Sequence, residues 1–306
     1  MPAEFSKNVY YGYILKGDLT GAVNYIGQFP EQAVLYQRLM DIFEKEQYVS
    51  YDVPADLDAL LSIYQRYYRD VFYLCIGKEE AASRLRAGLA EFFGIEDEST
   101  SLDDMEQNQV AGAFQSSGLH FLGGRTSGYY GPYVWRTTER MTYQVELPDG
   151  AWEFTVKLLD GFIARSWTDY LTFGEIGTGG WTDQDGVINC VKSAYDLESE
   201  AFKVSLLKHE AQHASDLKAC PDMSSVALEY RAKLVELIYS SERNLLAQFA
   251  QEADSTDRHN GHAFASARIL DDFARKSNLS SAEVERLPIP QVQAIARALY
   301  GESNVM

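Results

Sequence analysis

The stretch LLKHEAQHASDLKACP, Leu206 to Pro221, decides how the C-terminal part of this chain is interpreted. Two of the five histidines of the chain, His209 and His213, lie four residues apart in it, and Glu210 directly follows the first. On an α-helix, side chains at this spacing project side by side about one turn apart. Two imidazole nitrogens placed in this way can each reach one zinc ion at about 2.0–2.1 Å. The spacing therefore predicts a metal site on a helix, with an ordinary polar helix face as the alternative.

The residues around the two histidines indicate where this helix begins and ends. Asp196 is a suitable N-cap, and glutamates in the first turn favour the positive end of the helix dipole. Pro221 cannot continue a helix, so we expect the helix to end near Ala219. One stripe of the helix then carries Phe202, Leu206, His209, His213 and Asp216.

Glu210 is the candidate catalytic group of this stretch. It is rotated by about 100° around the helix axis from His209, so it can flank a metal ion without binding it. A carboxylate there can accept a proton from a water that the metal activates. The pattern His-Glu-x-x-His resembles the zincin metallopeptidases. That resemblance implies an α+β, zincin-like catalytic domain that holds one zinc ion per chain and hydrolyses a peptide or protein substrate, with Glu210 as general base.

A third protein ligand is needed, because two histidines leave a hydrolytic zinc site one ligand short. In the gluzincin branch of the zincins this ligand is a glutamate on the next helix, with a small residue three positions later. Glu229 resembles that pattern, since fifteen residues separate it from His213 and Ala232 takes the small position. The resemblance thus implies His209, His213 and Glu229 as ligands, with Glu236 as the second choice for the third.

The match covers about residues 185–241 and assigns no particular peptidase family. Leu228 and Lys233 stand where thermolysin-like enzymes have asparagine and aspartate, and Asp216 and Ala219 occupy the metzincin glycine and third-ligand positions, which excludes that branch. Glu229 and Lys233 also have the spacing of a helix-stabilising ion pair, which is the alternative to ligation. Asp216 lies about 10 Å along the axis from the first histidine, so we expect it to hydrogen-bond to a ligand histidine or to be solvated.

A peptidase of this kind also needs a donor for the oxyanion of the transition state. The segment after residue 256 offers His259 and His262, and we predict His262 as this second catalytic residue, with Tyr195, Tyr230 and Tyr239 as alternatives. Zincins bind extended substrates along an edge strand. The segment GVINCVKSAY (186–195) is the candidate for that strand, and an interior strand is the equal alternative.

Three regions can be distinguished along the chain. Residues 1–95 show the apolar spacing of helices, residues 96–110 are acidic and polar and indicate a linker, and residues 111–306 form the predicted zincin-like domain. In that domain, a Leu-Pro-Asp-Gly turn between Thr142–Leu147 and Trp152–Leu158 predicts a hairpin. After Asp196 we expect three or four helices, interrupted near Pro221, near residues 254–261 and near residues 287–290.

Composition excludes several classes of protein. The formal net charge of -18 disfavours nucleic acid and anionic membranes as partners. No apolar run approaches the roughly 20 residues of a membrane span, and no signal peptide is recognisable at the N-terminus, so a cytoplasmic location is expected. The three scattered cysteines predict no disulfide framework.

Three hypotheses therefore follow from the sequence. The first is a zinc-dependent metallopeptidase. The second is a metal-binding regulatory or interaction protein that keeps the zincin fold without peptidase activity. The third is a structural protein in which the motif is accidental. Metal analysis of protein purified without added metal separates the third from the other two.

Overall fold

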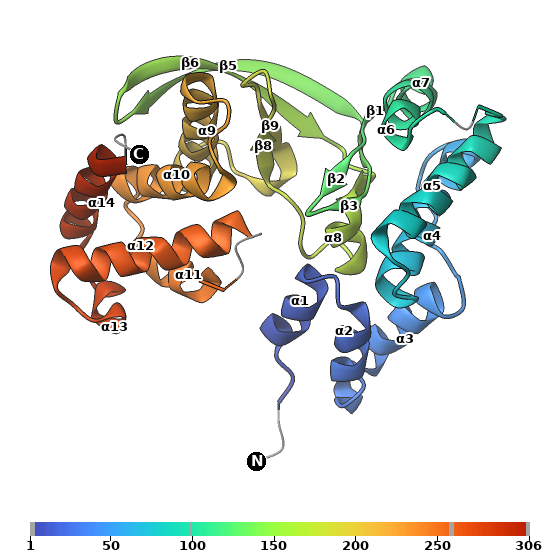
Figure 1. The fold of residues 1–306 in the computed structure, drawn as a ribbon, viewed down its shortest axis with the longest axis horizontal. Helices are drawn as coiled ribbons and strands as arrows, with labels where there is room; N and C mark the ends of the chain where they lie inside the picture. Colours follow the sequence, from blue (N-terminus) through green and yellow to red (C-terminus); the bar gives the residue numbers. More distant parts are fainter. Residues whose placement is uncertain (1–3, 98, 257–259, 304–306) are drawn as a thin grey trace. The chain divides into compact units, whose positions relative to one another are not determined.

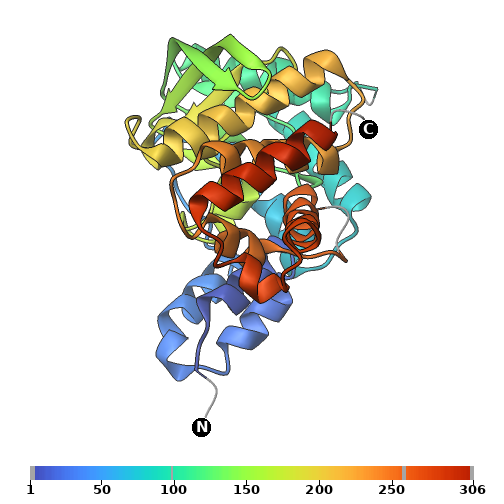
Figure 2. The same cartoon turned by 90° about the vertical axis from the view of Figure 1, so that its left-hand side faces the viewer.

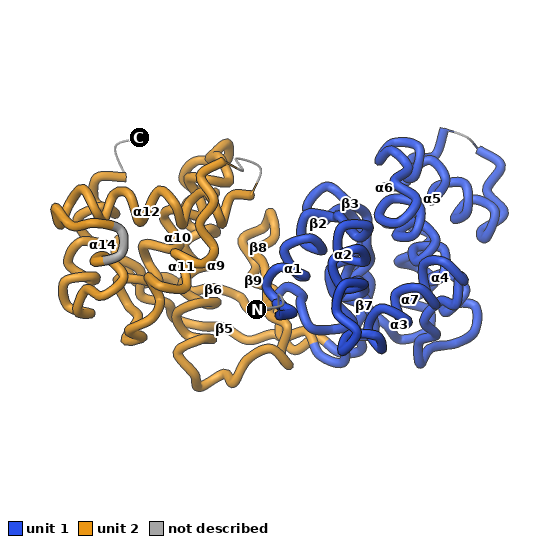
Figure 3. Tube along the Cα trace, turned by 90° about the horizontal axis from the view of Figure 1, so that it is seen from below, with its two compact units in different colours: residues 1–137, 160–178 blue, residues 138–159, 179–306 orange. Residues whose placement is uncertain are grey.

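The structure, a computed structural model, describes residues 4–97, 99–256 and 260–303 (Figure 1). Helices and sheets both contribute, as the α+β class predicted. The chain divides into two compact units, which Figure 3 shows in different colours. Unit 1 comprises Met1–Thr137 and Asp160–Thr178, and unit 2 comprises Thr138–Leu159 and Gly179–Met306. Each unit is therefore built from two separate segments of the sequence.

Unit 1 is mainly helical and carries two small antiparallel sheets, β1-β4-β7 and β2-β3. Its core is rich in aromatic side chains, among them the fully buried Tyr64, Phe72, Phe114 and Trp167. The elements are α1 Lys7–Leu15, α2 Leu19–Ile26, η1 Pro30–Gln32, α3 Ala33–Phe43, α4 Ala55–Tyr68, η2 Arg69–Tyr73, α5 Lys78–Phe93, α6 Leu102–Met105, η3 Glu106–Val110, α7 Ala111–Ser116, β1 His120–Leu122, β2 Arg125–Thr126, β3 Tyr129–Tyr130, β4 Tyr133–Trp135, β7 Ala164–Arg165 and α8 Ser166–Leu171.

The observed units do not follow the predicted boundaries at residues 95 and 110. The segment 96–110, predicted as a linker, contains α6 and η3 instead, and it buries Leu102, Met105 and Val110 in the core of unit 1. The segment is mostly acidic and polar, so its three buried apolar residues did not form a recognisable helical pattern. Helix α5 does end where the sequence indicated, because Gly94 adopts the left-handed conformation (φ 65°) that closes a helix.

Unit 2 contains one four-stranded sheet in the order β5-β6-β9-β8. The predicted hairpin is confirmed as β5 Thr137–Leu147 and β6 Gly150–Asp160, joined by Pro148 and Asp149. Strand β9 Ile188–Val191 runs parallel to β6 and antiparallel to β8 Gly180–Thr182. The interior-strand alternative therefore holds for the segment 186–195, and the short strand β8 forms the edge instead.

Helices make up the rest of unit 2, with α10 packed on α9, α12 and α14 (Figures 1 and 2). The apolar face of α10 buries Leu234, Val235 and Ile238. The elements are η4 Lys192–Ala194, η5 Ala201–Leu206, α9 Leu207–Ala219, α10 Ser225–Tyr239, α11 Leu245–Glu252, α12 Gly261–Ser277, α13 Ser281–Val284 and α14 Ile289–Ser303. No helix of the described residues combines the length and apolar character of a membrane span.

The motif helix ends at Ala219, as Pro221 predicted, but its start differs from the prediction. Asp196 caps only a preceding turn, in which its carboxylate accepts a hydrogen bond from the Glu198 N–H. The helical segment starts about three residues later, where the Ser199 hydroxyl accepts from the Phe202 N–H at 3.2 Å. Ser199, three positions after Asp196, is therefore the residue whose side chain caps the helical segment.

Candidate metal centre

Helix α9 places the two motif histidines side by side in unit 2. The Nε2 atoms of His209 and His213 lie 3.0 Å apart, and the two rings meet edge to face with centroids 4.6 Å apart. The side chains are 6% and 12% exposed, respectively. The i,i+4 spacing thus produces the predicted pair, with both Nε2 atoms directed at one point.

Helix α10 brings Glu229 to the same point. Ser224 starts this helix by accepting a hydrogen bond from the Ala227 N–H. Glu229 Oε2 lies 3.3 Å from His209 Nε2, and Glu229 Oε1 lies 3.5 Å from His213 Nε2. The surface-pair alternative fails, because Lys233 forms its ion pair with Glu252 at 2.7 Å. His209, His213 and Glu229 form a group whose ligand atoms all lie within 4.8 Å of one another, and which can hold a metal ion.

The spacing of the three donors suits a tetrahedral ion. Ligands about 2.0–2.1 Å from zinc, at the tetrahedral angle, lie about 3.3–3.4 Å from one another. The observed separations are 3.0, 3.3 and 3.5 Å. Glu229 Oε2 is buried and faces two imidazoles, with His209 Nε2 at 3.3 Å and His262 Nδ1 at 2.9 Å. A buried carboxylate requires positive charge beside it, so this position is suited to a cation.

The charges of these groups affect one another strongly. Burial alone would lower the pKa of His209, but hydrogen bonds to Glu229 and Glu236 outweigh burial and raise the pKa of His209 to about 10. Burial would raise the pKa of Glu229, whereas hydrogen bonds from His209, His213 and His262 hold that pKa far below its ordinary value. Glu229 is thus an anion ready to bind a cation, and a metal ion must displace a proton from His209.

Glu236 lies behind His209 rather than in the metal group. Its Oε1 atom accepts a hydrogen bond from His209 Nδ1–H at 2.7 Å, and both side chains are less than a tenth exposed. A donor at Nδ1 leaves the lone pair of Nε2 free for the metal. Glu236, the second choice for the third ligand, therefore orients the ring of His209 instead.

We expect Glu236→Leu to weaken zinc binding by about 10–100-fold, the usual cost of losing the hydrogen-bond partner of a ligand histidine. Glu236→Gln keeps an acceptor for Nδ1–H and should retain more of the affinity. The affinity is measured by competition with a fluorescent chelator, and Glu242→Leu, at an exposed glutamate just after α10, serves as the control. Equal affinities for the Glu236→Leu variant and the native chain would show that Glu236 does not orient His209.

Glu210 lies beside the histidine pair on α9, half-buried. Thr182 Oγ1 donates a hydrogen bond to Glu210 Oε2 at 2.8 Å, and it lies 2.9 Å from the main-chain oxygen of Glu210. Among the described residues, no hydrogen bond to the other carboxylate oxygen, Oε1, is present. The predicted base is therefore held through one oxygen and free at the other. No pattern in the sequence pointed to Thr182.

His262 also reaches the centre, from the first turn of α12, which Asn260 caps. Its Nδ1 atom lies 2.9 Å from Glu229 Oε2, its ring lies parallel to that of His209 with centroids 6.0 Å apart, and its side chain is 55% exposed. Of the other candidate donors, Tyr195 packs its ring against Phe202, with centroids 6.2 Å apart. The Tyr230 hydroxyl donates to Asp272, the Tyr239 ring lies under the Lys208 ammonium, and His259 falls outside the described residues.

Asp216 takes a role that neither prediction named. It is 5% exposed, and both of its oxygens lie 2.9 Å from Arg231 Nε. Gln212 Nε2 donates to it as well, at 2.8 Å. Asp216 is therefore neither solvated nor bonded to a ligand histidine. It fixes α9 to α10 through a buried ion pair, one turn of α9 beyond His213.

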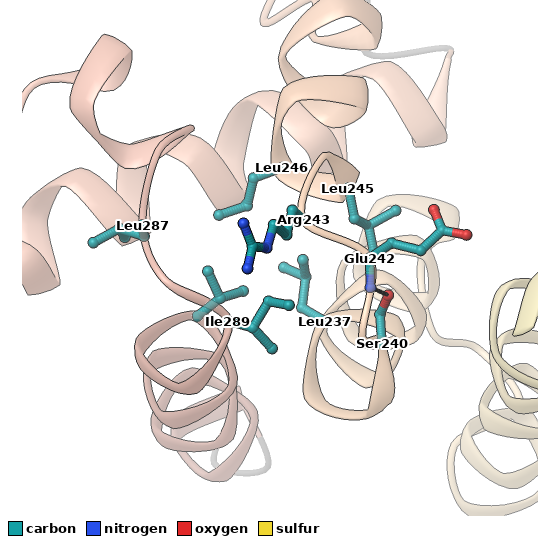
Figure 4. A pocket seen from close by; sticks show the side chains of 9 residues that line it. Leu237, Ser240, Glu242, Arg243, Leu245, Leu246, Leu287 and Ile289 are labelled. Carbon is teal, nitrogen blue, oxygen red and sulfur yellow. Dashed lines mark hydrogen bonds between the residues drawn. The ribbon is translucent and has the colours of Figure 1, made fainter.

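The hollow in Figure 4 lies elsewhere in unit 2 and shares no residue with the metal centre. Leu237, Leu246, Leu287 and Ile289 line it with other residues, and Figure 4 shows the Arg243 side chain lying among them. Ser240 and Glu242 also line it, but among the described residues no histidine or cysteine does, and no group of metal-binding side chains lies there. The metal centre is therefore the site with the clearest chemistry.

Comparison of the chain with models of known families, with curated proteins and with solved structures gave no match. The geometry of the metal centre is therefore what indicates the chemistry of this chain.

Proposed function

We propose that the protein is a zinc-dependent metallopeptidase whose unit 2 is a zincin-like domain. The observation that carries the proposal is the arrangement of His209, His213 and Glu229 at tetrahedral spacing, with the carboxylate of Glu210 beside them. Three protein donors leave one corner of a tetrahedral ion for water, which is the pattern of a hydrolytic site. Zinc held there would act as a Lewis acid and lower the pKa of a water toward neutrality.

Glu210 performs the proton transfers in this proposal. Its free oxygen, Oε1, accepts a proton from the water that attacks the scissile carbonyl, and it then returns that proton to the leaving amine. Glu236 keeps Nδ1 of His209 protonated throughout, so that Nε2 stays a donor to the metal.

His262 is the proposed donor for the oxyanion. A neutral imidazole carries a single N–H, so this ring can serve Glu229 through Nδ1 or the oxyanion through Nε2, but not both. The imidazolium form serves both at once. The exposure of the ring, 55%, leaves it accessible to a substrate.

The test begins with metal analysis of protein purified without added metal. We expect one zinc per chain, cleavage of a pool of quenched fluorescent peptides, loss of cleavage with 1,10-phenanthroline, and recovery when zinc is returned. Bound zinc without cleavage of any peptide would favour the regulatory, non-hydrolytic alternative. Absence of any bound metal would favour an accidental motif.

A further inference from the structure

We propose that Thr182 is the positioning residue of Glu210, holding the carboxylate of the general base from the edge strand of the sheet. This inference depends on the proposed function for its kinetic consequence. The Thr182 hydroxyl carries one hydrogen, and both acceptors within reach belong to Glu210: Oε2 at 2.8 Å and the main-chain oxygen at 2.9 Å. Whichever acceptor it serves at a given moment, the hydroxyl is tied to this one residue.

The local sequence explains why a threonine stands there. A Cβ atom on Gly180 would lie 2.6 Å from the Asn189 main-chain oxygen on β9 and 2.6 Å from Leu206 Cδ1 beside the motif helix. Only glycine permits β8 to approach both neighbours so closely. Side chains alternate along a strand, so Thr182 faces the same side as Gly180, which is the side of the helix. The glycine thus sets the distance at which the next side chain on that face meets Glu210.

The contact restricts a side chain that is otherwise adjustable. Glutamate has three rotatable bonds, and fixing them at a reacting geometry costs conformational entropy. Threonine is branched at Cβ and stiff about χ1, so its hydroxyl is a fixed reference point. With Oε2 held by Thr182, Oε1 is left to receive a proton. Without this contact, the Glu210 carboxylate would have to reach the reacting position again in each turnover. We therefore expect a lower kcat with unchanged substrate binding.

The kinetic test compares three variants on the single peptide that the native protein cleaves best. Thr182→Val removes the hydroxyl and keeps the shape, and we expect kcat to fall by about 10–100-fold, the cost of a misplaced catalytic group. KM and zinc content should stay unchanged. Thr182→Ser keeps the hydroxyl and should recover most of kcat. Thr155→Val, at a half-buried threonine on β6, is the matched control and should behave as the native chain.

A merely structural threonine predicts a different pattern, in which Thr182→Val and Thr182→Ser both lose stability and zinc without a selective change in kcat. That pattern, or native kcat in the Thr182→Val variant, would overturn the inference while leaving the peptidase intact.

Crystal structures of the zinc-loaded native chain and of Thr182→Val decide the inference independently of turnover. We expect the Glu210 carboxylate to leave its position when the hydroxyl is removed. An unmoved carboxylate would overturn the role of Thr182 even if no peptide is ever cleaved, whereas a moved carboxylate in a chain that cleaves nothing would uphold the contact and reject the proposed function.

Discussion

Glu210→Gln should leave one zinc per chain in place and lower kcat for peptide hydrolysis by about 10²–10⁴-fold, the usual contribution of a general acid–base group. The amide has nearly the same shape, and it can still accept the hydrogen bond that Thr182 donates to Oε2. It cannot take a proton from water at neutral pH. The metal donors come from His209, His213 and Glu229, so their affinity should be almost unaffected. Zinc content by atomic absorption and initial rates on the cleaved peptide check both parts.

Glu198→Gln is the matched control for this variant. Glu198 precedes the same helix, is exposed and pairs with Lys203, so its loss should change neither zinc content nor rate. Full activity in the Glu210→Gln variant would remove Glu210 from the mechanism. Loss of zinc in that variant would instead place Glu210 among the ligands.

Arg231→Met should lower the free energy of local unfolding around α9 and α10 by about 3–5 kcal/mol, as expected when one partner of a buried ion pair is removed. The guanidinium pairs with Asp216, and it also donates hydrogen bonds to Ser303 Oγ and to the Tyr300 hydroxyl, both at 2.8 Å. Without it, the Asp216 carboxylate is left charged and only 5% exposed. Hydrogen exchange of the amides in α9 and α10 measures the change directly.

A second substitution separates the buried charge from the lost contacts. Asp216→Leu added to Arg231→Met removes the orphaned carboxylate and should restore part of the stability. Arg84→Met is the control, because Arg84 forms an exposed pair with Glu80 and should cost about 0–1 kcal/mol. A loss below about 1 kcal/mol for Arg231→Met would mean that Asp216 finds water or another partner.

The grouping of His209, His213 and Glu229 could be predicted, the histidine pair from helix periodicity and Glu229 from the resemblance to the gluzincin pattern. A spacing of four residues places two imidazoles together on one helix, and Pro221 fixes where that helix ends. Glu236 was harder to assign, although the signal was present. It lies seven residues after Glu229, two turns along the same face of α10, so one carboxylate can approach each ring nitrogen of His209.

Features that depend on pairing between distant segments could not be predicted. Strand β8 has three residues, too few for an alternating pattern, so the interior strand β9 looked like the natural edge. The sequence around Asp216 does not indicate its ion-pair partner, because Arg231 lies on another helix amid apolar residues. The unit boundaries escaped prediction for a related reason, since residues 160–178 return to unit 1 after the hairpin.

The interleaving of the two units sets an order of events on the ribosome. Every residue of unit 1 has been polymerised by Thr178, before any of β8, β9 or the motif helix exists. Strand β6 is complete at Asp160, but its parallel neighbour β9 begins only at Ile188. At a synthesis rate of about 5–20 residues per second, this separation corresponds to a delay of roughly one to six seconds. During that interval β6 lacks the strand beside which its buried residues Val156 and Leu158 lie in the finished unit.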